Sequence, residues 1–333
     1  MNAVNIAAFS AKAYDHDFLL QAANEYTRFC CYDVALNPVT ASMAKGIQVV
    51  SAFVNDDLGR ETLEVLANGG TELISLRCAG TNNVDLSAAK EFGLAVMNVP
   101  AYAPHAVAEH TIALMLALGR KLPRAYNRVR DGNFSLDGLL GFDFHGKTVG
   151  IIGGGKIGRL VGERLKAFGC QILVADPYNG EQCEKLGFTS VDLEDLYSQS
   201  DLISLHCPLL DSTRHLIDRQ AIAKMKPGVM LINTSRGALI DTSAVLSALK
   251  EHHIGYLGLD VYEQEGSLFF EDHSTDIIQD DVFQRLITLP NVLVTGHQAY
   301  FSKGALSHIS AITVTNIMEF ILDKPLSNEV RLN

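Results

Sequence analysis

The sequence predicts an α/β protein with two doubly wound domains, each built on a parallel sheet. Short apolar runs typical of strands alternate with segments whose apolar residues recur at helical spacing. This alternation stops once, at a long helical stretch, and then begins again. The 333 residues are enough for two such domains, because a domain takes about 100 to 200 residues.

The first third of the chain has the pattern of a small α/β unit. Its strand-like runs are residues 4–9, 34–36, 47–53, 73–77 and 94–98. Helical spacing occupies residues 15–26 and 61–68 between them. Strands that alternate with helices pair in parallel, since each helix returns the chain to the same end of the sheet.

A long helical stretch separates the two alternating regions. Residues 105–130 are rich in Ala and Leu and are interrupted only by Pro123, and a loop over residues 131–145 follows. Another helix is expected over residues 305–322. The second alternation has six strand-like runs, at residues 148–152, 171–175, 202–205, 229–233, 256–259 and 292–294. Six strands with crossovers between them match a doubly wound domain.

Composition argues against several classes of function. Asp and Glu number 38 against 27 Lys and Arg, a net charge of −11, so nucleic acid and membrane surfaces are not expected as partners. No apolar window reaches the ~20 residues of a membrane-spanning helix, and the first residues lack a secretory pattern, so we expect a cytoplasmic protein. The six cysteines show no CxxC spacing, which predicts reduced thiols and no metal site.

The clearest chemical signal is a glycine-rich turn that follows residues 148–152. Gly153, Gly155 and Gly158 have the GxGxxG spacing of dinucleotide-binding proteins. The first glycine permits a tight turn, the second lets the backbone approach a pyrophosphate, and the third lets a helix pack closely on the strand. Asp176 ends the next strand-like run, near the ~20-residue offset at which a carboxylate binds ribose hydroxyls. Because no Arg or Lys stands beside Asp176 to pair with a 2′-phosphate, we expect NAD and not NADP.

The last three strand-like runs end in side chains that suit the handling of a small carboxylic acid. Arg236 follows the first of them and can hold a carboxylate through its planar fork of donors. The carboxylates Asp260, Glu263 and Glu265 follow the second. His297 follows the third and suits proton exchange near neutral pH. Loops at the carboxyl ends of parallel strands meet near the cofactor crevice, so we expect these groups to share one site.

Four segments in order resemble the D-isomer-specific 2-hydroxyacid dehydrogenases, and within that family most closely the NAD-dependent D-lactate dehydrogenases of fermentation. They are the Gly153 turn, NTSRGALID, GLDVYEQE and TGHQAY. The similarity extends from RCAGTNNVD, which begins at Arg77, to the last helix. It implies a Rossmann cofactor domain, residues 102–299, inserted into a flavodoxin-like substrate domain made of residues 1–101 and 300–333.

The resemblance also implies roles for individual residues. Arg236 binds the substrate's carboxylate and carbonyl, His297 is the acid/base, and Glu265 hydrogen-bonds His297 and favours its charged form. Glu263 competes for that last role, but Glu265 stands five residues after Asp260, as the active Glu of the family does. Cofactor contacts are implied for Lys156, Ile157, Cys207, Pro208, Thr213, Thr234, Ser235 and Asp260.

In the first domain, the resemblance implies that the backbone of Ala79 and Gly80 grips the substrate carboxylate and that Tyr102 forms an aromatic wall beside it. Such a pocket favours a short substrate side chain, so the implied reaction is the reversible reduction of pyruvate to D-lactate by NADH. We expect a homodimer or a homotetramer. Two alternatives stay open, namely a bulkier 2-keto acid as substrate and an NAD(H)-sensing regulatory protein on the same fold. Formate dehydrogenase activity is not expected, because that branch has Gln where Glu265 stands.

Overall fold

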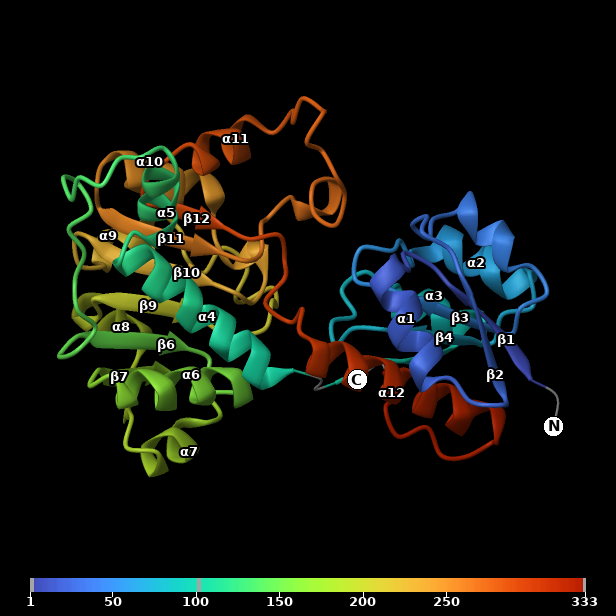
Figure 1. Cartoon of the computed structure of the whole chain (residues 1–333). Coiled ribbons are helices and arrows are strands. Elements are labelled where there is room, and N and C mark those ends of the chain that lie inside the picture. Colours follow the sequence, from blue (N-terminus) through green and yellow to red (C-terminus); the bar gives the residue numbers. More distant parts are fainter. Residues whose placement is uncertain (1–2, 101–102, 332–333) are drawn as a thin grey trace. The chain divides into compact units, whose positions relative to one another are not determined.

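The protein folds into two compact units, each with one parallel sheet (Figure 1). The computed structural model describes residues 3–100 and 103–331. One unit comprises residues 1–103 and 301–333, and the other comprises residues 104–300. The predicted α/β class with two parallel sheets is confirmed.

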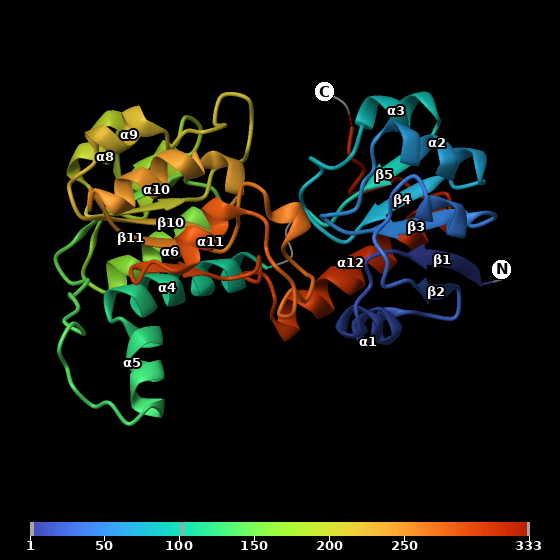
Figure 2. The same cartoon turned by 90° about the horizontal axis from the view of Figure 1, so that it is seen from above.

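The discontinuous unit has a five-stranded sheet in the order β2-β1-β3-β4-β5, which is the flavodoxin-like order. Its strands are β1 (Val4–Ala8), β2 (Thr27–Cys31), β3 (Val49–Ala52), β4 (Leu73–Leu76) and β5 (Ala95–Met97). Helices α1 (Ala13–Ala22) and α12 (Lys303–Ile321) lie on one face (Figure 2). Helices α2 (Arg60–Asn68) and α3 (Leu86–Glu91) lie on the other, with a short 3-10 turn at Thr40–Ala44.

Burial on both faces explains why β3 and β4 were recognisable in the sequence. Every residue of these two central strands is buried, because helices cover the sheet on both sides. Strands of this kind are continuous apolar runs without alternation.

The edge strand β2 was predicted in the wrong place. Residues 34–36 are not a strand, and Val34 is 46% exposed. The strand is Thr27–Cys31, in which Thr27 and Phe29 are buried while Arg28 points outward. An edge strand needs only one apolar face, so its sequence is less apolar than the run that follows it.

The continuous unit has a seven-stranded parallel sheet in the order β12-β11-β10-β9-β6-β7-β8. The strands are β6 (Thr148–Ile152), β7 (Gln171–Ala175), β8 (Thr189–Ser190), β9 (Leu202–Leu205), β10 (Val229–Asn233), β11 (Ile254–Leu259) and β12 (Val292–Val294). The order reverses between β6 and β9, and the crevice at such a reversal is where doubly wound sheets bind dinucleotides. Strand β8 was not predicted, because a two-residue strand is too short for periodicity.

Helices cover both faces of this second sheet (Figure 2). On one face lie α4 (Pro104–Gly119) and α6 (Lys156–Ala167). On the other lie α8 (Leu193–Gln199), α9 (Arg219–Lys224) and α10 (Thr242–Lys250). The remaining helices are α5 (Leu122–Arg130), α7 (Gly180–Lys185) and α11 (Asp281–Ile287), and 3-10 turns span Gly237–Leu239 and Glu265–Ser267.

The single long helix expected over residues 105–130 is in fact two helices. Helix α4 ends at Gly119, and Lys121 adopts a left-handed backbone with a φ of 53°. Pro123 then lies in the first turn of α5, where its missing N–H is not needed. Proline therefore begins the second helix here and does not interrupt the first.

None of the described helices combines the length and apolar character that a membrane crossing needs. The six cysteines carry free thiols. In the described part of the chain, no group of three or more His, Cys, Asp or Glu side chains is arranged to hold a metal ion.

Candidate active site

A cavity of about 590 Å³ opens at the carboxyl ends of β6, β7 and β9 in the continuous unit. This is the edge at which the strand order reverses. Six of the residues predicted to bind the cofactor line the cavity: Gly153, Gly155, Asp176, Cys207, Pro208 and Thr213. The structure therefore brings together residues from three separate strand ends.

The glycine-rich turn has the geometry that a dinucleotide requires. Gly153 has a φ of 100°, and a Cβ atom there would lie 2.6 Å from the backbone nitrogen of Cys207. A Cβ atom at Gly158 would overlap the carbonyl oxygen of Gly153, so helix α6 packs directly on the turn. At Gly155, which caps α6, no atom lies within 4 Å of a Cβ position. A pyrophosphate can therefore approach the backbone and the positive end of the helix dipole.

Asp176 is held by several hydrogen bonds. Its Oδ2 accepts from the backbone N–H of Gly154 at 2.6 Å, and its Oδ1 accepts from those of Tyr178 and Asn179 at 2.7 and 2.8 Å. Desolvation raises the pKa of Asp176, but these hydrogen bonds outweigh it and leave the pKa below its usual value. The carboxylate is charged and can still accept from ribose hydroxyls through its remaining lone pairs.

His206 and Cys207 follow β9 and present neutral side chains to the same cavity. Burial lowers the pKa of His206 to about 4, and its Nε2 lies 2.9 Å from the hydroxyl of Ser204. Burial raises the pKa of Cys207 to about 11. A neutral imidazole and a neutral thiol are suited to packing against a cofactor and not to proton transfer near pH 7.

The other six cofactor candidates do not line this cavity; they are Lys156, Ile157, Gly158, Thr234, Ser235 and Asp260. Lys156 and Ile157 begin helix α6 directly after Gly155. The buried hydroxyl of Thr234 lies 2.9 Å from that of Thr111 on α4, and the hydroxyl of Ser235 donates to the carbonyl of Cys207 at 2.7 Å. Thr234 and Ser235 thus tie the loop after β10 to its neighbours.

Arg236 extends from that same loop, which packs tightly on the loop after β11. A Cβ atom at Gly237 would overlap the backbone of Tyr262, so only glycine allows this approach. One guanidinium nitrogen, Nη1, donates to the carbonyl of Ser235 at 2.8 Å. The other guanidinium donors have no partner in the described part of the chain and remain able to bind a carboxylate.

His297 and Glu265 form a hydrogen-bonded pair after β12 and β11, which are neighbouring strands. Nδ1 of His297 lies 2.8 Å from Oε1 of Glu265, and both side chains are mostly buried. The second carboxylate oxygen of Glu265 accepts from the backbone N–H of Tyr262 at 2.9 Å. Because Nδ1 faces the carboxylate, Nε2 is the nitrogen left to exchange a proton, and it has no partner among the residues described.

Glu263, the competing carboxylate, is occupied elsewhere. Its Oε1 lies 2.5 Å from Nε2 of His215, and its Oε2 accepts from the hydroxyl of Thr242 at 3.0 Å. The geometry thus pairs His297 with Glu265.

Asp260 has no exposed surface and orients the loop that carries His297. Its carboxylate accepts from the hydroxyl of Thr295 at 2.5 Å and from the backbone N–H groups of Gln298 and Ala299 at 2.9 and 2.8 Å. Its carbonyl accepts from the N–H of His297 at 2.7 Å, where the backbone φ is 51°. Burial raises the pKa of Asp260, but these hydrogen bonds and one from His110 outweigh it and leave the pKa below its usual value.

His110 is a functional candidate that sequence reasoning missed. Its Nε2 lies 3.0 Å from the hydroxyl of Thr295 and 3.4 Å from Oδ1 of Asp260. It projects from α4, far from these residues in the sequence, so no local motif marks it. Only the packing of α4 against the sheet reveals this contact.

In the discontinuous unit, Ala79 and Gly80 follow β4 and are half-buried. The carbonyl of Ala79 accepts from the amide of Asn98 at 2.8 Å. The N–H groups of Ala79 and Gly80 have no acceptor among the described residues and are available to an anion. Tyr102, the predicted aromatic wall, lies outside the described residues. Arg77 is structural, since its guanidinium donates to the carbonyls of Phe9 and Ser51 at 2.6 and 3.1 Å.

Comparison with known proteins places these features in a family. Residues 112–299 match the model of the "D-isomer specific 2-hydroxyacid dehydrogenase, NAD binding domain". The chain is 51% identical to the D-lactate dehydrogenase of Escherichia coli over 98% of this chain and 100% of that protein.

Solved structures agree with the sequence comparisons. The pyruvate reductase of Chlamydomonas reinhardtii has a TM-score of 0.92 at 43% identity, over 98% of this chain and 99% of that one. A D-lactate dehydrogenase of Aquifex aeolicus, solved with NAD and lactic acid, has a TM-score of 0.87 at 33% identity, again over 98% and 99%. With the dinucleotide cavity and the His–Glu pair, these matches show that the chain is an NAD-dependent enzyme of the D-isomer-specific 2-hydroxyacid dehydrogenase family.

Proposed function

We propose that this protein catalyses the reversible reduction of pyruvate to D-lactate with NADH. The observation that carries the proposal is the 2.8 Å contact between His297 and Glu265, with Nε2 of the imidazole left free. Arg236 lies at the end of the adjacent strand, β10, which provides a carboxylate-binding group on the same sheet edge. The relatives named above as a D-lactate dehydrogenase and a pyruvate reductase favour the three-carbon substrate.

Each of these residues has a distinct task in the reaction. NADH, when bound, supplies the hydride that reduces the keto carbon. Arg236 binds the substrate carboxylate and polarises the keto group through its fork of donors. Nε2 of His297 gives its proton to the oxygen that becomes the hydroxyl, and takes it back in lactate oxidation. Glu265 accepts a hydrogen bond from Nδ1 of His297. Its carboxylate thereby stabilises the protonated imidazole from which the proton is given.

The two units divide the work. We assign cofactor binding to residues 102–299, which also carry Arg236 and His297, and assign further substrate contacts to the substrate domain, residues 1–101 and 300–333. The glycine-rich turn, Asp176 and the cavity that they border support the assignment of cofactor binding. The free N–H groups of Ala79 and Gly80 support the second, since paired backbone donors are suited to a carboxylate. Tyr102 is proposed as the aromatic wall that keeps the substrate short.

Self-association is part of the proposal. Helix α5 has no buried residue, and large apolar side chains on it and on the loop that follows are exposed. They are Leu122, Tyr126, Val129, Phe134, Leu136 and Leu140. An apolar surface of this kind typically marks a protein–protein contact, which supports a homodimer or a homotetramer. The free thiols support a reducing compartment, and we propose the cytoplasm.

The test is NADH oxidation against a panel of 2-keto acids of increasing size, with chiral analysis of each product. The proposal predicts the highest kcat/KM for pyruvate and a product of D configuration. Preference for phenylpyruvate or a branched 2-keto acid would replace the substrate assignment with the bulkier alternative. Absence of turnover with every member, despite NADH binding, would instead favour an NAD(H)-sensing regulator.

A further inference from the structure

A second cavity of the continuous unit lies at the opposite edge of its sheet from the dinucleotide cavity. Its volume is about 510 Å³, and it is bordered by the first residues of β11 and β12 and by the segments that follow α4 and α10. All strands of this sheet run parallel. The starts of β11 and β12 are therefore remote from the carboxyl ends that carry Asp176 and His297, and neither proposed site extends to this cavity.

This cavity concentrates positive charge in an acidic protein. Its basic lining residues are Lys121, Arg124, Lys250, His252 and Arg285, and neither Asp nor Glu is among the lining residues. The chain as a whole carries a net charge of −11. Like charges around one cavity repel one another, and a bound anion removes that repulsion.

The basic side chains around this cavity form no ion pair with a carboxylate of the described residues. Within the described ranges, Arg124, Lys250, His252 and Arg285 contact no carboxylate, and the Lys121 ammonium donates only to the carbonyl of Gly138 at 3.2 Å. Of the other lysines and arginines in the described ranges, some pair with a neighbouring Asp or Glu, as Arg60, Lys224 and Lys226 do, and others, including Arg219, form no ion pair. The donors around the cavity thus remain available.

Ordinary helix electrostatics explains only part of this cluster. Lys250 and Arg285 lie in the last turns of α10 and α11, where the helix dipole favours a cation. Lys121 and Arg124, in contrast, lie at the start of α5, where the dipole disfavours one. Lys121 and His252 have φ angles of 53° and 60°, a conformation usually left to glycine. Lys121, Arg124 and His252 are therefore basic although neither the helix dipole nor the backbone conformation favours a basic residue at their positions.

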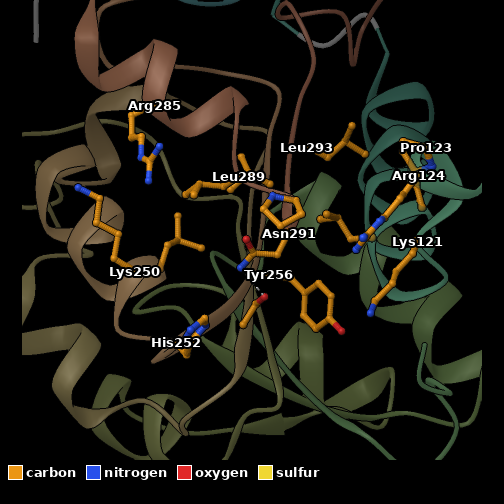
Figure 3. A pocket seen from close by; sticks show the side chains of 16 residues that line it. Lys121, Pro123, Arg124, Lys250, His252, Tyr256, Arg285, Leu289, Asn291 and Leu293 are labelled. Carbon is orange, nitrogen blue, oxygen red and sulfur yellow. Dashed lines mark hydrogen bonds between the residues drawn. The ribbon is translucent and has the colours of Figure 1, made fainter. Parts of the chain in front are cut away.

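The basic side chains lie on two sides of the cavity. Figure 3 shows Lys121 and Arg124 on one side and Lys250, His252 and Arg285 on the other, with Tyr256 and Asn291 between them. A ligand with a single charged group reaches only one of these sides, whereas one with two or more anionic groups can reach both.

We propose that this cavity binds a small polyvalent anion, either a polycarboxylate or a phosphate ester. The guanidinium groups of Arg124 and Arg285 accept such oxygens in two-point fashion, and Lys121 adds a point charge. The cavity volume falls within the range of about 300 to 1,000 Å³ that small-molecule sites occupy. An acidic segment of a second copy of this chain presents the same carboxylate chemistry, so the experiment must distinguish the two sources.

The experiment is calorimetric titration of the NADH-saturated protein with sodium pyrophosphate at low ionic strength. Bound NADH fills the dinucleotide site, so pyrophosphate cannot report on that site. We expect one saturable site per chain, with an affinity that falls as NaCl is added. Arg124→Gln and Arg285→Gln should each weaken binding roughly tenfold, the effect of losing one charge-assisted contact. Arg124→Lys should lose less, because it keeps the charge.

Arg219→Gln is the matched control, since Arg219 is exposed on α9 and does not line the cavity. It removes the same charge and should leave the affinity unchanged. Equal weakening by Arg219→Gln would show a general charge effect and overturn the site. The absence of saturable binding would also overturn it. A third contradicting result is that the parent protein binds no pyrophosphate while sedimentation shows a weaker dimer in Arg124→Gln and Arg285→Gln. Thermal melts of all variants confirm that each is folded.

Discussion

At the scale of single residues, hydrogen-bond partners separate the roles of two carboxylates that follow β11, Asp260 and Glu265. Asp260 is buried and accepts from Thr295, Gln298 and Ala299, so it holds the loop of the acid/base in place. Glu265 contacts that acid/base directly. The resemblance to the family implied the contact of Glu265 with His297, whereas the role of Asp260 depends on a loop that is distant in sequence.

Asp260→Asn should destabilise the protein by about 1 to 3 kcal/mol near neutral pH, because an amide nitrogen replaces an oxygen among buried donors. The low pKa of folded Asp260 means that its charge stabilises the fold above the unfolded pKa of ~3.9. That stability is lost as pH falls through the folded-state pKa. The Tm difference between variant and parent should thus shrink as pH falls below about 4. A difference that stays constant or grows contradicts this role.

Cofactor choice depends on the charge of Asp176. A 2′-phosphate is repelled by this carboxylate, so Asp176→Ser should lower the ratio of kcat/KM for NADH over NADPH by about tenfold or more. Because Ser also removes bonds to Gly154 and Tyr178, Asp176→Asn serves as the second variant, since it keeps an acceptor. Steady-state kinetics with both cofactors measure the ratio. A parent enzyme that uses both cofactors equally contradicts the assignment.

Arg236→Lys keeps a charge but loses the planar fork. We expect a higher KM for pyruvate and a lower kcat, with NADH affinity unchanged, because only substrate contacts are lost. Pyruvate kinetics and NADH fluorescence titration measure the two effects. Kinetics equal to those of the parent would contradict substrate binding by Arg236 and leave it a structural role, the hydrogen bond to the carbonyl of Ser235.

At the scale of elements, strands buried on both faces were predictable and their connections were not. Strands β6, β7, β9 and β10 lie inside the sheet and have the predicted bounds, since central strands are uninterrupted apolar runs. The short edge strand β12 also has its predicted bounds, although none of its residues is fully buried. The break between α4 and α5 depends on the left-handed Lys121, which composition does not reveal. Most catalytic candidates follow such strands, which is why they could be found without an alignment.

His252, the left-handed residue after α10, allows a test of backbone strain. His252→Gly should raise stability by about 1 kcal/mol, or Tm by about 2 °C, because glycine adopts a φ of 60° without steric cost. His252→Ala removes the imidazole but keeps the strain, so it should give no gain. Thermal melts followed by circular dichroism compare the two. Equal Tm changes in both variants would assign the effect to the side chain.

At the scale of the whole molecule, the fold assembles groups that no sequence motif unites. The basic cavity draws Lys121, Lys250 and Arg285 from three distant segments, so composition showed only a net charge of −11. His110 reaches Asp260 in the same way, through packing of α4 on the sheet. Residues placed by strand ends were predictable, whereas residues placed by helix packing required the structure.

The pH dependence of Glu265→Gln tests the central claim most directly. Pyruvate reduction requires a protonated His297, and the Glu265 carboxylate stabilises that charge at 2.8 Å. Gln keeps a hydrogen-bonding group but removes the charge. Its reduction rate should therefore begin to fall at a lower pH than that of the parent, while activity at acidic pH partly survives. A reductive pH profile that overlays that of the parent would contradict the pair and make Glu263 the next carboxylate to test.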